Sequence, residues 1–264
     1  YGQDLQLLAL REYHEQFRAD LVVEVLTPGN DINDIMWPTH WGKQSIYSKP
    51  TFRLVNAELV EPTERIGQQI VLSRSTLLSR ILRFGMGDRN SEWEQYLPAP
   101  YVPLAQYEGP VTKRTYPYGA SVTLTKDALD HDQSFMNLFL TPRSARITYA
   151  LDLMRALLTE MKRIVSQQGG RFMLHTAGPH DDLAIVLQGQ EVLEVKGKYY
   201  AISSEQARAN LEYVTSGFEY YHSPVTLEAW AVGPEDGHLN EHAVDEAMAS
   251  LAGKIVPLLS AQGR

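Results

Sequence analysis

The stretch Leu21-Val22-Val23-Glu24-Val25-Leu26 is short, rich in β-branched residues and almost continuously apolar. Such a run is typical of a strand buried on both faces, as in a parallel sheet. Residues 1–20 carry apolar side chains at spacings of three and four, which predicts a helix before the strand. Thr27-Pro28-Gly29-Asn30-Asp31-Ile32-Asn33-Asp34 follows it and is rich in turn residues, so we expect a loop at the strand end.

The same alternation of helix and strand resumes near residue 144. An apolar stripe from Ile147 to Val165 predicts a long helix that Gly169 and Gly170 end. Further elements are expected in this order: a strand at 171–176, a loop at 177–180, a helix at 204–218, a strand at 225–229 and a helix at 243–259. Strands separated by helices favour a parallel sheet with right-handed crossovers. We therefore expect an α/β fold, a three-layer α/β/α sandwich around a central parallel sheet.

Residues 36–130 interrupt this rhythm. They hold three of the four tryptophans and many of the prolines, with short strands expected at 51–56 and 121–124 and a helix at 70–84. We interpret them as a long aromatic-rich insertion in a single domain that spans residues 1–264. Such an insertion is typical of a lid or a substrate-binding wall.

Composition excludes several classes of function. The formal net charge is −8, which argues against a nucleic-acid partner or an anionic membrane surface, because both require a basic footprint. The chain has no cysteine, so a disulfide, a thiol nucleophile and a cysteine-ligated metal are impossible. No apolar run reaches the ~20 residues of a membrane span. These features choose neither a cellular compartment nor an oligomeric state.

Catalytic residue types are concentrated in Gly233-Pro234-Glu235-Asp236-Gly237-His238-Leu239-Asn240-Glu241-His242, which we expect to be a polar loop between a strand and the last helix. In one interpretation Asp236 orients His238 as a general base toward a hydroxyl nucleophile. In a second, His238 and His242 stand at i and i+4 on a helix beside Glu241, as in inverted zinc proteases. In a third, Asp236 or Asn240 caps the last helix and the histidines are solvated.

The zinc interpretation lacks a third ligand. An acidic ligand is expected much further downstream, but beyond Glu246 the sequence has no Asp, Glu or His. Pro234 and Gly237 also place His238 at the helix entry rather than within a helix. We therefore expect neither a metal nor another cofactor.

Two parts of the chain resemble a known family. Tyr1-Gly2-Gln3-Asp4-Leu5-Gln6-Leu7-Leu8, Asp20-Leu21-Val22-Val23 and Pro28-Gly29-Asn30-Asp31 resemble the middle of bacterial SGNH hydrolases, also called GDSL-type lipases and esterases. The closing Glu235-Asp236-Gly237-His238-Leu239-Asn240 resembles the last block of that family. The resemblance implies a flavodoxin-like fold and a serine-dependent ester hydrolase or acyltransferase without a cofactor. Its substrate would be a small-molecule, lipid or polysaccharide ester.

The resemblance also implies roles for individual residues. Asn30 would donate its side-chain amide to the oxyanion, His238 would be the general base, and Asp236 would orient it. The commoner family spacing puts the acid three residues before the histidine, where this chain has Glu235, so Glu235 stays the second candidate.

Four other residues are candidates for lining the site. Trp37 and Trp41 follow the Asn30 loop and are expected to bind an acyl chain or a sugar face, or else to pack within the insertion. His175 and His180 flank another strand end and would either line the pocket or be satisfied structural residues.

The nucleophile of the family has no counterpart in residues 1–264. The family's serine lies in a Gly-Asp-Ser block on its first strand, and a second oxyanion glycine comes just before the position that Tyr1 occupies. We therefore expect the nucleophile upstream of Tyr1, since Ser73, Ser75, Ser91 and Ser121 read as surface or capping serines. The alternatives are a catalytically inactive ligand-binding relative and a fragment that a partner polypeptide completes.

Overall fold

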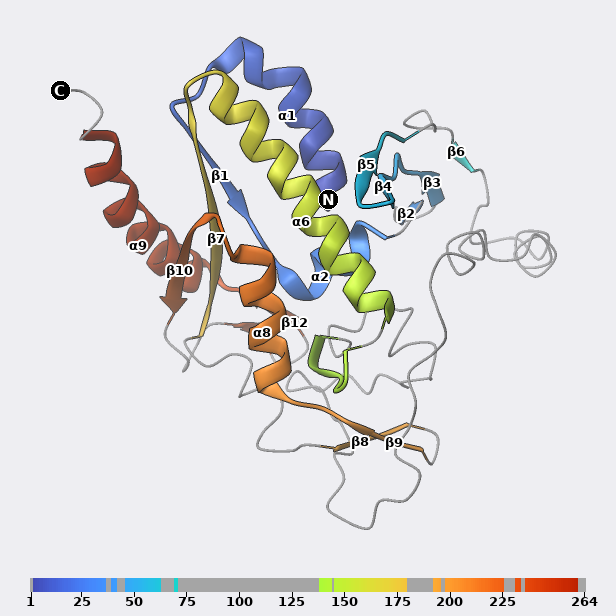
Figure 1. Ribbon diagram of the computed structural model, residues 1–264. Helices are drawn as coiled ribbons and strands as arrows, with labels where there is room; N and C mark the ends of the chain where they lie inside the picture. Colours follow the sequence, from blue (N-terminus) through green and yellow to red (C-terminus); the bar gives the residue numbers. More distant parts are fainter. Residues whose placement is uncertain are drawn as a thin grey trace.

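The centre of the protein is a three-stranded parallel sheet. The computed structural model describes residues 2–36, 39–41, 46–62, 69–70, 138–143, 145–179, 192–195, 198–225, 231–233 and 236–260. The sheet order is β1–β7–β10, with β1 at Leu21–Val25, β7 at Arg171–Pro179 and β10 at Glu219–Val225. Both pairings are parallel (Figure 1). This confirms the expected α/β class with a central parallel sheet.

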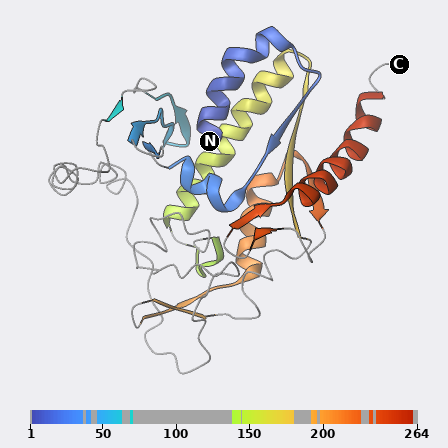
Figure 2. The ribbon, with the colours of Figure 1, turned by 180° about the vertical axis from the view of Figure 1, so that it is seen from behind.

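Four longer helices surround the sheet. They are α1 (Gln3–Phe17), α6 (Ala145–Gln167), α8 (Ser204–Thr215) and α9 (Glu241–Ser260). Helix α6 packs against α1, α8 and β7, whereas α9 packs against β10. Seen from behind, α9 lies in front of the sheet and α6 lies beyond it (Figure 2). None of the helices within the described ranges is long and apolar enough to cross a bilayer.

Side chains on the two faces of β7 belong to two different hydrophobic cores. Phe172 and Leu174 of β7 belong to the large core that α6 covers. Ala177 of the same strand instead packs with Val225 and α9 in a second cluster. Because successive strand residues point to opposite faces, one strand serves both cores. The parallel sheet is therefore covered on both sides at β7 and β10.

The end of α6 matches the expectation from its two glycines. Gly169 has a φ of +82°, in the left-handed region that favours glycine. The amide of Gly170 donates to the Val165 carbonyl at 3.1 Å, and that of Gly169 donates to the Ser166 carbonyl at 3.0 Å. These two bonds form a Schellman motif, which directs the chain at once into β7.

The smaller elements form separate antiparallel sheets. The order β2–β3–β6 and the hairpins β4–β5, β8–β9 and β11–β12 are all outside the parallel sheet. Their bounds, with the short helix α2, are as follows: α2 Pro28–Asp34, β2 Thr39–Trp41, β3 Ile46–Ser48, β4 Arg53–Val55, β5 Glu58–Val60, β6 Gln69–Ile70, β8 Val192–Val195, β9 Lys198–Ala201, β11 Ala231–Gly233 and β12 Asp236–Leu239.

Several boundaries differ from the sequence prediction. The third parallel strand was expected at 225–229 but is β10, which ends at Val225. Its sequence is only partly apolar, so hydropathy misses it. The polar Ser223 is accommodated in the sheet because it pairs with His175 of β7. Residues 177–179, expected as a loop, belong to β7. The strand expected at 51–56 is confirmed as β4. The helix expected at 70–84 is wrong at residue 70, which belongs to β6, and its other residues and the strand at 121–124 lie outside the described residues.

Two glycines provide a matched test of this packing. A Cβ at Gly170 would lie 2.7 Å from the Ala19 carbonyl oxygen and 2.9 Å from Val165 Cγ1, whereas one at Gly253 of α9 would meet nothing within 4 Å. Gly170→Ala should lower the free energy of unfolding by about 1–3 kcal/mol through overpacking. Gly253→Ala should raise it by up to about 1 kcal/mol through helix propensity. Urea unfolding checks both, and equal effects at the two sites would contradict the packing described here.

Candidate functional site

The chain after β1 enters a short helix instead of the expected loop. Pro28 begins α2, where a missing backbone N–H has no consequence. The Thr27 amide donates to Asp31 Oδ2 at 2.7 Å, and the Asp31 amide donates to the Thr27 carbonyl at 2.9 Å. These two bonds enclose Pro28, Gly29 and Asn30, so the backbone at Asn30 is fixed in the first turn of α2. The Asn30 side chain itself is outside the described part of the chain.

Asp31 also connects α2 to α1 and β1. Gln3 Nε2 donates to Asp31 Oδ2 at 2.7 Å and approaches Glu24 Oε1 at 3.5 Å. All three side chains are buried. Burial, with the negative charge of Asp31, raises the pKa of Glu24 to about 8 against the effect of the Gln3 amide. Burial also raises the pKa of Asp31 to about 6.

An ion pair lies beside these carboxyl groups. Lys49 Nζ is 2.6 Å from Asp4 Oδ2, and the two side chains are 4% and 0% exposed. Lys49 also donates to the Asp34 carbonyl in α2. Burial raises the pKa of Asp4, although the Lys49 ammonium opposes that shift. We call Gln3, Asp4, Glu24, Asp31 and Lys49 the buried polar cluster; it joins α1, β1, α2 and the segment after β3.

Asp236 and His238 lie in a strand rather than in a loop at a helix entry. β12 pairs antiparallel with β11, with Ala231 opposite Leu239 and Gly233 opposite Asp236. The expected polar loop is therefore wrong as a description of these two residues, because backbone pairing holds them in a hairpin. Their side chains, and Glu235 as a whole, are outside the described residues.

β12 and α2 lie at the same end of the parallel sheet. Leu239, which ends β12, packs against the cluster that contains Val225 at the end of β10 and Ala177 near the end of β7. Leu26, directly after β1, donates its amide to the His175 carbonyl of β7 at 2.7 Å. Figures 1 and 2 both place α2 and the β11–β12 hairpin at this end. Ligands of open α/β sheets bind outside the carboxyl ends of the strands, which is the edge described here.

Asn240 caps the last helix. Its Oδ1 accepts from the Ala243 amide at 2.9 Å, and its carbonyl accepts from the Val244 amide at 2.9 Å. The capping interpretation is thus confirmed for Asn240. His238 lies in β12 while the exposed His242 lies in the first turn of α9, so the two histidines do not share a helical face. No group of three or more potential metal ligands occurs among the residues with described positions.

His175 and Ser223 form a hydroxyl–imidazole pair within the sheet. His175 Nε2 lies 2.8 Å from Ser223 Oγ, and both residues are 0% exposed. Burial and the nearby His222 lower the pKa of His175, which favours the neutral ring. Nδ1 is buried and has no partner among the described residues, so none of their carboxylates orients this imidazole. We interpret the pair as structural, since substrate cannot reach it; His180 lies outside the described residues.

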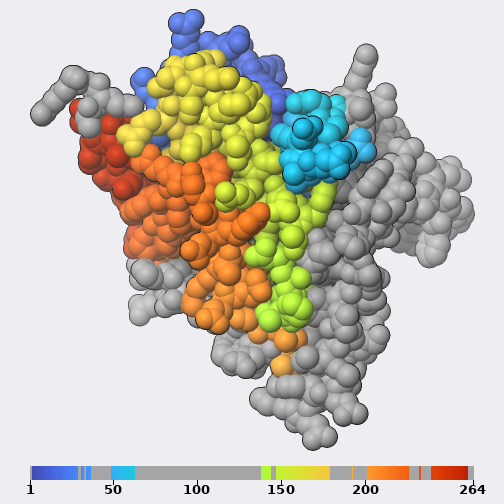
Figure 3. Space-filling view, in the orientation of Figure 1, coloured from blue at the N-terminus to red at the C-terminus, as the bar shows by residue number. Residues whose placement is uncertain are grey.

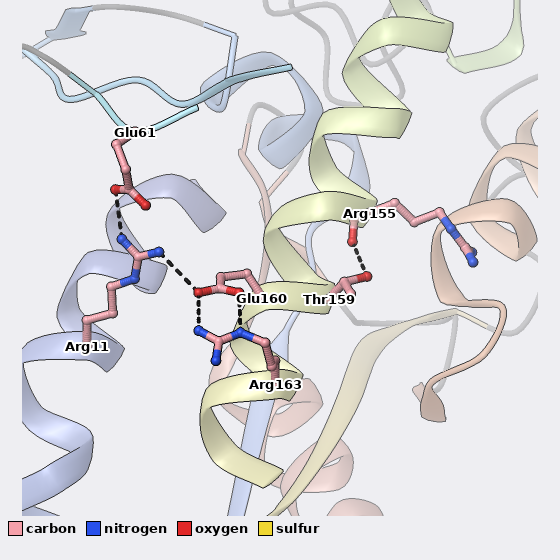
Figure 4. A network of polar contacts seen from close by, with 6 residues as sticks. All are labelled: Arg11, Glu61, Arg155, Thr159, Glu160 and Arg163. Atoms are coloured by element: carbon pink, nitrogen blue, oxygen red, sulfur yellow. Dashed lines mark hydrogen bonds and ion pairs between the residues drawn. The ribbon is translucent and has the colours of Figure 1, made fainter. Parts of the chain in front are cut away.

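A trough of about 810 Å³ runs over α6, between the β4–β5 hairpin and α8 (Figure 3). Three charged residues of its lining, Arg11, Glu61 and Glu160, form ion pairs, which Arg163 extends from outside the lining. Arg11 contacts Glu61 at 2.8 Å and Glu160 at 3.2 Å, and Arg163 contacts Glu160 at 2.7 Å (Figure 4). Among the described residues, the lining includes none from α2 or β12. This trough is therefore distinct from the edge where the predicted residues lie, and its ion pairs fasten the hairpin to α1 and α6.

Comparison of the chain with protein-family models, with curated proteins and with solved structures gives no match. The fold and the site therefore define a class only: an α/β protein whose parallel sheet carries, at its carboxyl edge, the turn of Asn30 and the hairpin of Asp236 and His238. Sequence reasoning missed the buried polar cluster. The available signal was Glu24, the single charge in an otherwise apolar strand.

The Asp4–Lys49 ion pair gives a test of the cluster. Lys49→Met should lower the free energy of unfolding by about 3–5 kcal/mol, because it leaves a buried carboxylate without its cation. Adding Asp4→Asn should restore part of this loss. Arg163→Met, which breaks an exposed pair, should have far less effect. If thermal or urea unfolding finds Lys49→Met as mild as Arg163→Met, the cluster is not buried as described.

Proposed function

We propose that this protein is a serine-dependent ester hydrolase or acyltransferase with an SGNH-type three-layer sandwich. Asn30 is the oxyanion donor, His238 the general base, and Asp236 the acid that orients it. The observation that carries the proposal is the shared position of α2 and β12 at the carboxyl edge of the sheet, although they come from opposite ends of the chain.

These residue types match the requirements of acyl transfer. The imidazole of His238 removes the proton of a serine hydroxyl, whose oxygen attacks the acyl carbonyl. The Asn30 amide stabilises the resulting oxyanion, and the histidine returns the proton to the departing alcohol. Water, or the hydroxyl of a second substrate, then takes the acyl group from the serine by the same steps in reverse order. Glu235 is the alternative to Asp236 as the orienting acid.

The serine itself is not identified in residues 1–264. One feature of the fold supports a nucleophile beside Asn30. β1 is outermost in the order β1–β7–β10 of the described strands, and its apolar residue Val25 is 49% exposed. A parallel strand next to β1 would end beside the first turn of α2. A strand that carries the Gly-Asp-Ser block of the family would fit this position.

The proposed substrate is an ester of a small molecule, a lipid or a polysaccharide. The aromatic-rich insertion at 36–130 is the proposed substrate wall, with Trp37 and Trp41 contacting an acyl chain or a sugar face. Trp41 belongs to β2, its side chain is outside the described part, and Trp37 is outside it altogether. Different insertions on one scaffold change substrates, so the fold does not fix which ester is used.

The proposal predicts the kinetics of three variants of the protein at its natural length. Asn30→Ala should lower kcat for a nitrophenyl ester by about 10²–10³-fold, the effect of losing one oxyanion donor. His238→Ala should lower it by about 10³-fold or more. His242→Ala is the matched control: His242 is exposed on α9, and the variant should leave kcat unchanged.

Fluorophosphonate labelling and metal analysis complete the test. Label on one serine, lost in His238→Ala, supports the mechanism, and the labelled peptide identifies the nucleophile. Turnover that needs His242 and stoichiometric zinc would replace this mechanism with the metal one. Absence of both turnover and label would leave the non-catalytic ligand-binding alternative.

A further inference from the structure

Two buried carboxyl groups at the site share too few hydrogen-bond donors. Asp31 Oδ2 accepts from the Thr27 amide and from Gln3 Nε2, both at 2.7 Å. The only partner given by the described residues for Glu24 is the same Gln3 nitrogen, at 3.5 Å. Glu24 is 8% exposed and Asp31 is 6% exposed. Ionising both adjacent carboxyl groups with so little solvation is costly, so near neutral pH one of them retains a proton.

The nearby charges do not remove this conflict. Asp34 of α2 adds further negative charge next to Asp31. The cation of the cluster, Lys49, forms its ion pair with Asp4, at 2.6 Å, and not with Glu24 or Asp31. No described cation therefore pairs with Glu24.

Gln3 has a matching deficit. Its Oε1 is buried and has no hydrogen-bond partner among the described residues, although its Nε2 is used. A buried acceptor without a donor is costly, and a protonated carboxyl is a donor. One proton on Glu24 thus relieves the charge conflict and supplies a donor next to Gln3.

We propose that Glu24, Gln3 and Asp31 form a one-proton latch, which positions the turn that carries Asn30 and loosens when the proton leaves. The proposal rests on the function proposed for Asn30. When Glu24 ionises, its charge repels Asp31 and weakens the Gln3–Asp31 bond. Asp31 then holds the Thr27 amide less firmly, and the two bonds that enclose Asn30 open more often. Gln3, Glu24 and Asp31 are positioning residues, because none of them needs to touch substrate.

The direction of the pH effect follows from the raised pKa of Glu24. A carboxyl whose pKa is higher in the folded state is stabilising while protonated, that is, below its unfolded value of 4.5, and this contribution is lost as pH rises through about 8. The corresponding contribution of Asp31 is lost as pH rises through about 6. Asp31 is therefore already ionised when Glu24 begins to lose its proton. The latch is closed near neutral pH and opens in mild alkali.

The first test follows the proton without using activity. The Cδ chemical shift of Glu24, assigned in ¹³C-glutamate-labelled protein of natural length by its absence in Glu24→Gln, should titrate near pH 8. Hydrogen exchange at the Thr27 and Asp31 amides, corrected for the intrinsic pH dependence, should accelerate over the same range. We expect about tenfold or more, because a shift of one pKa unit corresponds to a tenfold change in the opening equilibrium to which the proton is coupled. In Glu24→Gln this acceleration should vanish, whereas Glu12→Gln, an exposed site on α1, should retain it.

The second test separates the latch from the proposed function. Ester hydrolysis by the wild type should fall in kcat as pH rises through about 8, and Glu24→Gln should remove that fall. A Cδ titration near pH 4.5, or exchange that ignores Glu24 ionisation, would overturn the latch even if the protein hydrolyses esters. If Glu24 titrates near pH 8 and the exchange follows it, but no ester is hydrolysed at any pH, the esterase role is refuted. The link between the latch and catalysis is then refuted as well.

Discussion

The carboxylate of Asp31 is the interaction on which the candidate site depends. It accepts one hydrogen bond from the chain leaving β1 and one from the first turn of α1, each at 2.7 Å. Through these bonds a single side chain fixes the orientation of α2 relative to the sheet. Because the carboxylate is buried, each bond is stronger than it would be in water, and losing either leaves a poorly solvated charge. The position of Asn30 is a consequence of this arrangement.

This dependence explains why polar residues occur so deep beside β1. A hydrophobic residue at Glu24 would pack with less penalty, but it would remove the second acceptor of Gln3 Nε2 and leave that nitrogen with Asp31 alone. The cluster links segments from α1, β1 and α2, together with Lys49, at a single point. Such a network costs stability compared with an apolar core, and it specifies one geometry in return.

The sequence predicted the framework of the fold well and its edges poorly. The helix of residues 3–17, the strand of residues 21–25 and the glycine stop after α6 follow from local periodicity and capping, and all three were predicted. The turn after β1 was expected as a loop, because Pro-Gly-Asn-Asp is a turn signal and the helix depends on a long-range bond from Gln3. The hairpin at Asp236 was missed for a similar reason, since its strands are stabilised by pairing and have no apolar alternation. The partners of Glu24 come from elements that are distant in the sequence, so no local pattern reveals them.

The proposed mechanism requires the side-chain amide of Asn30, after β1, and the imidazole of His238, in β12, to contact the same reacting acyl group and serine. The most direct measurement is a crystal structure of the natural-length protein with a phosphonate covalently bound to its serine. We expect Asn30 Nδ2 to lie about 3 Å from the phosphoryl oxygen, as an oxyanion donor requires, and His238 to lie beside the serine oxygen. A phosphonate bound with Asn30 facing away from it, or with His238 at another edge of the sheet, would rule out these two roles.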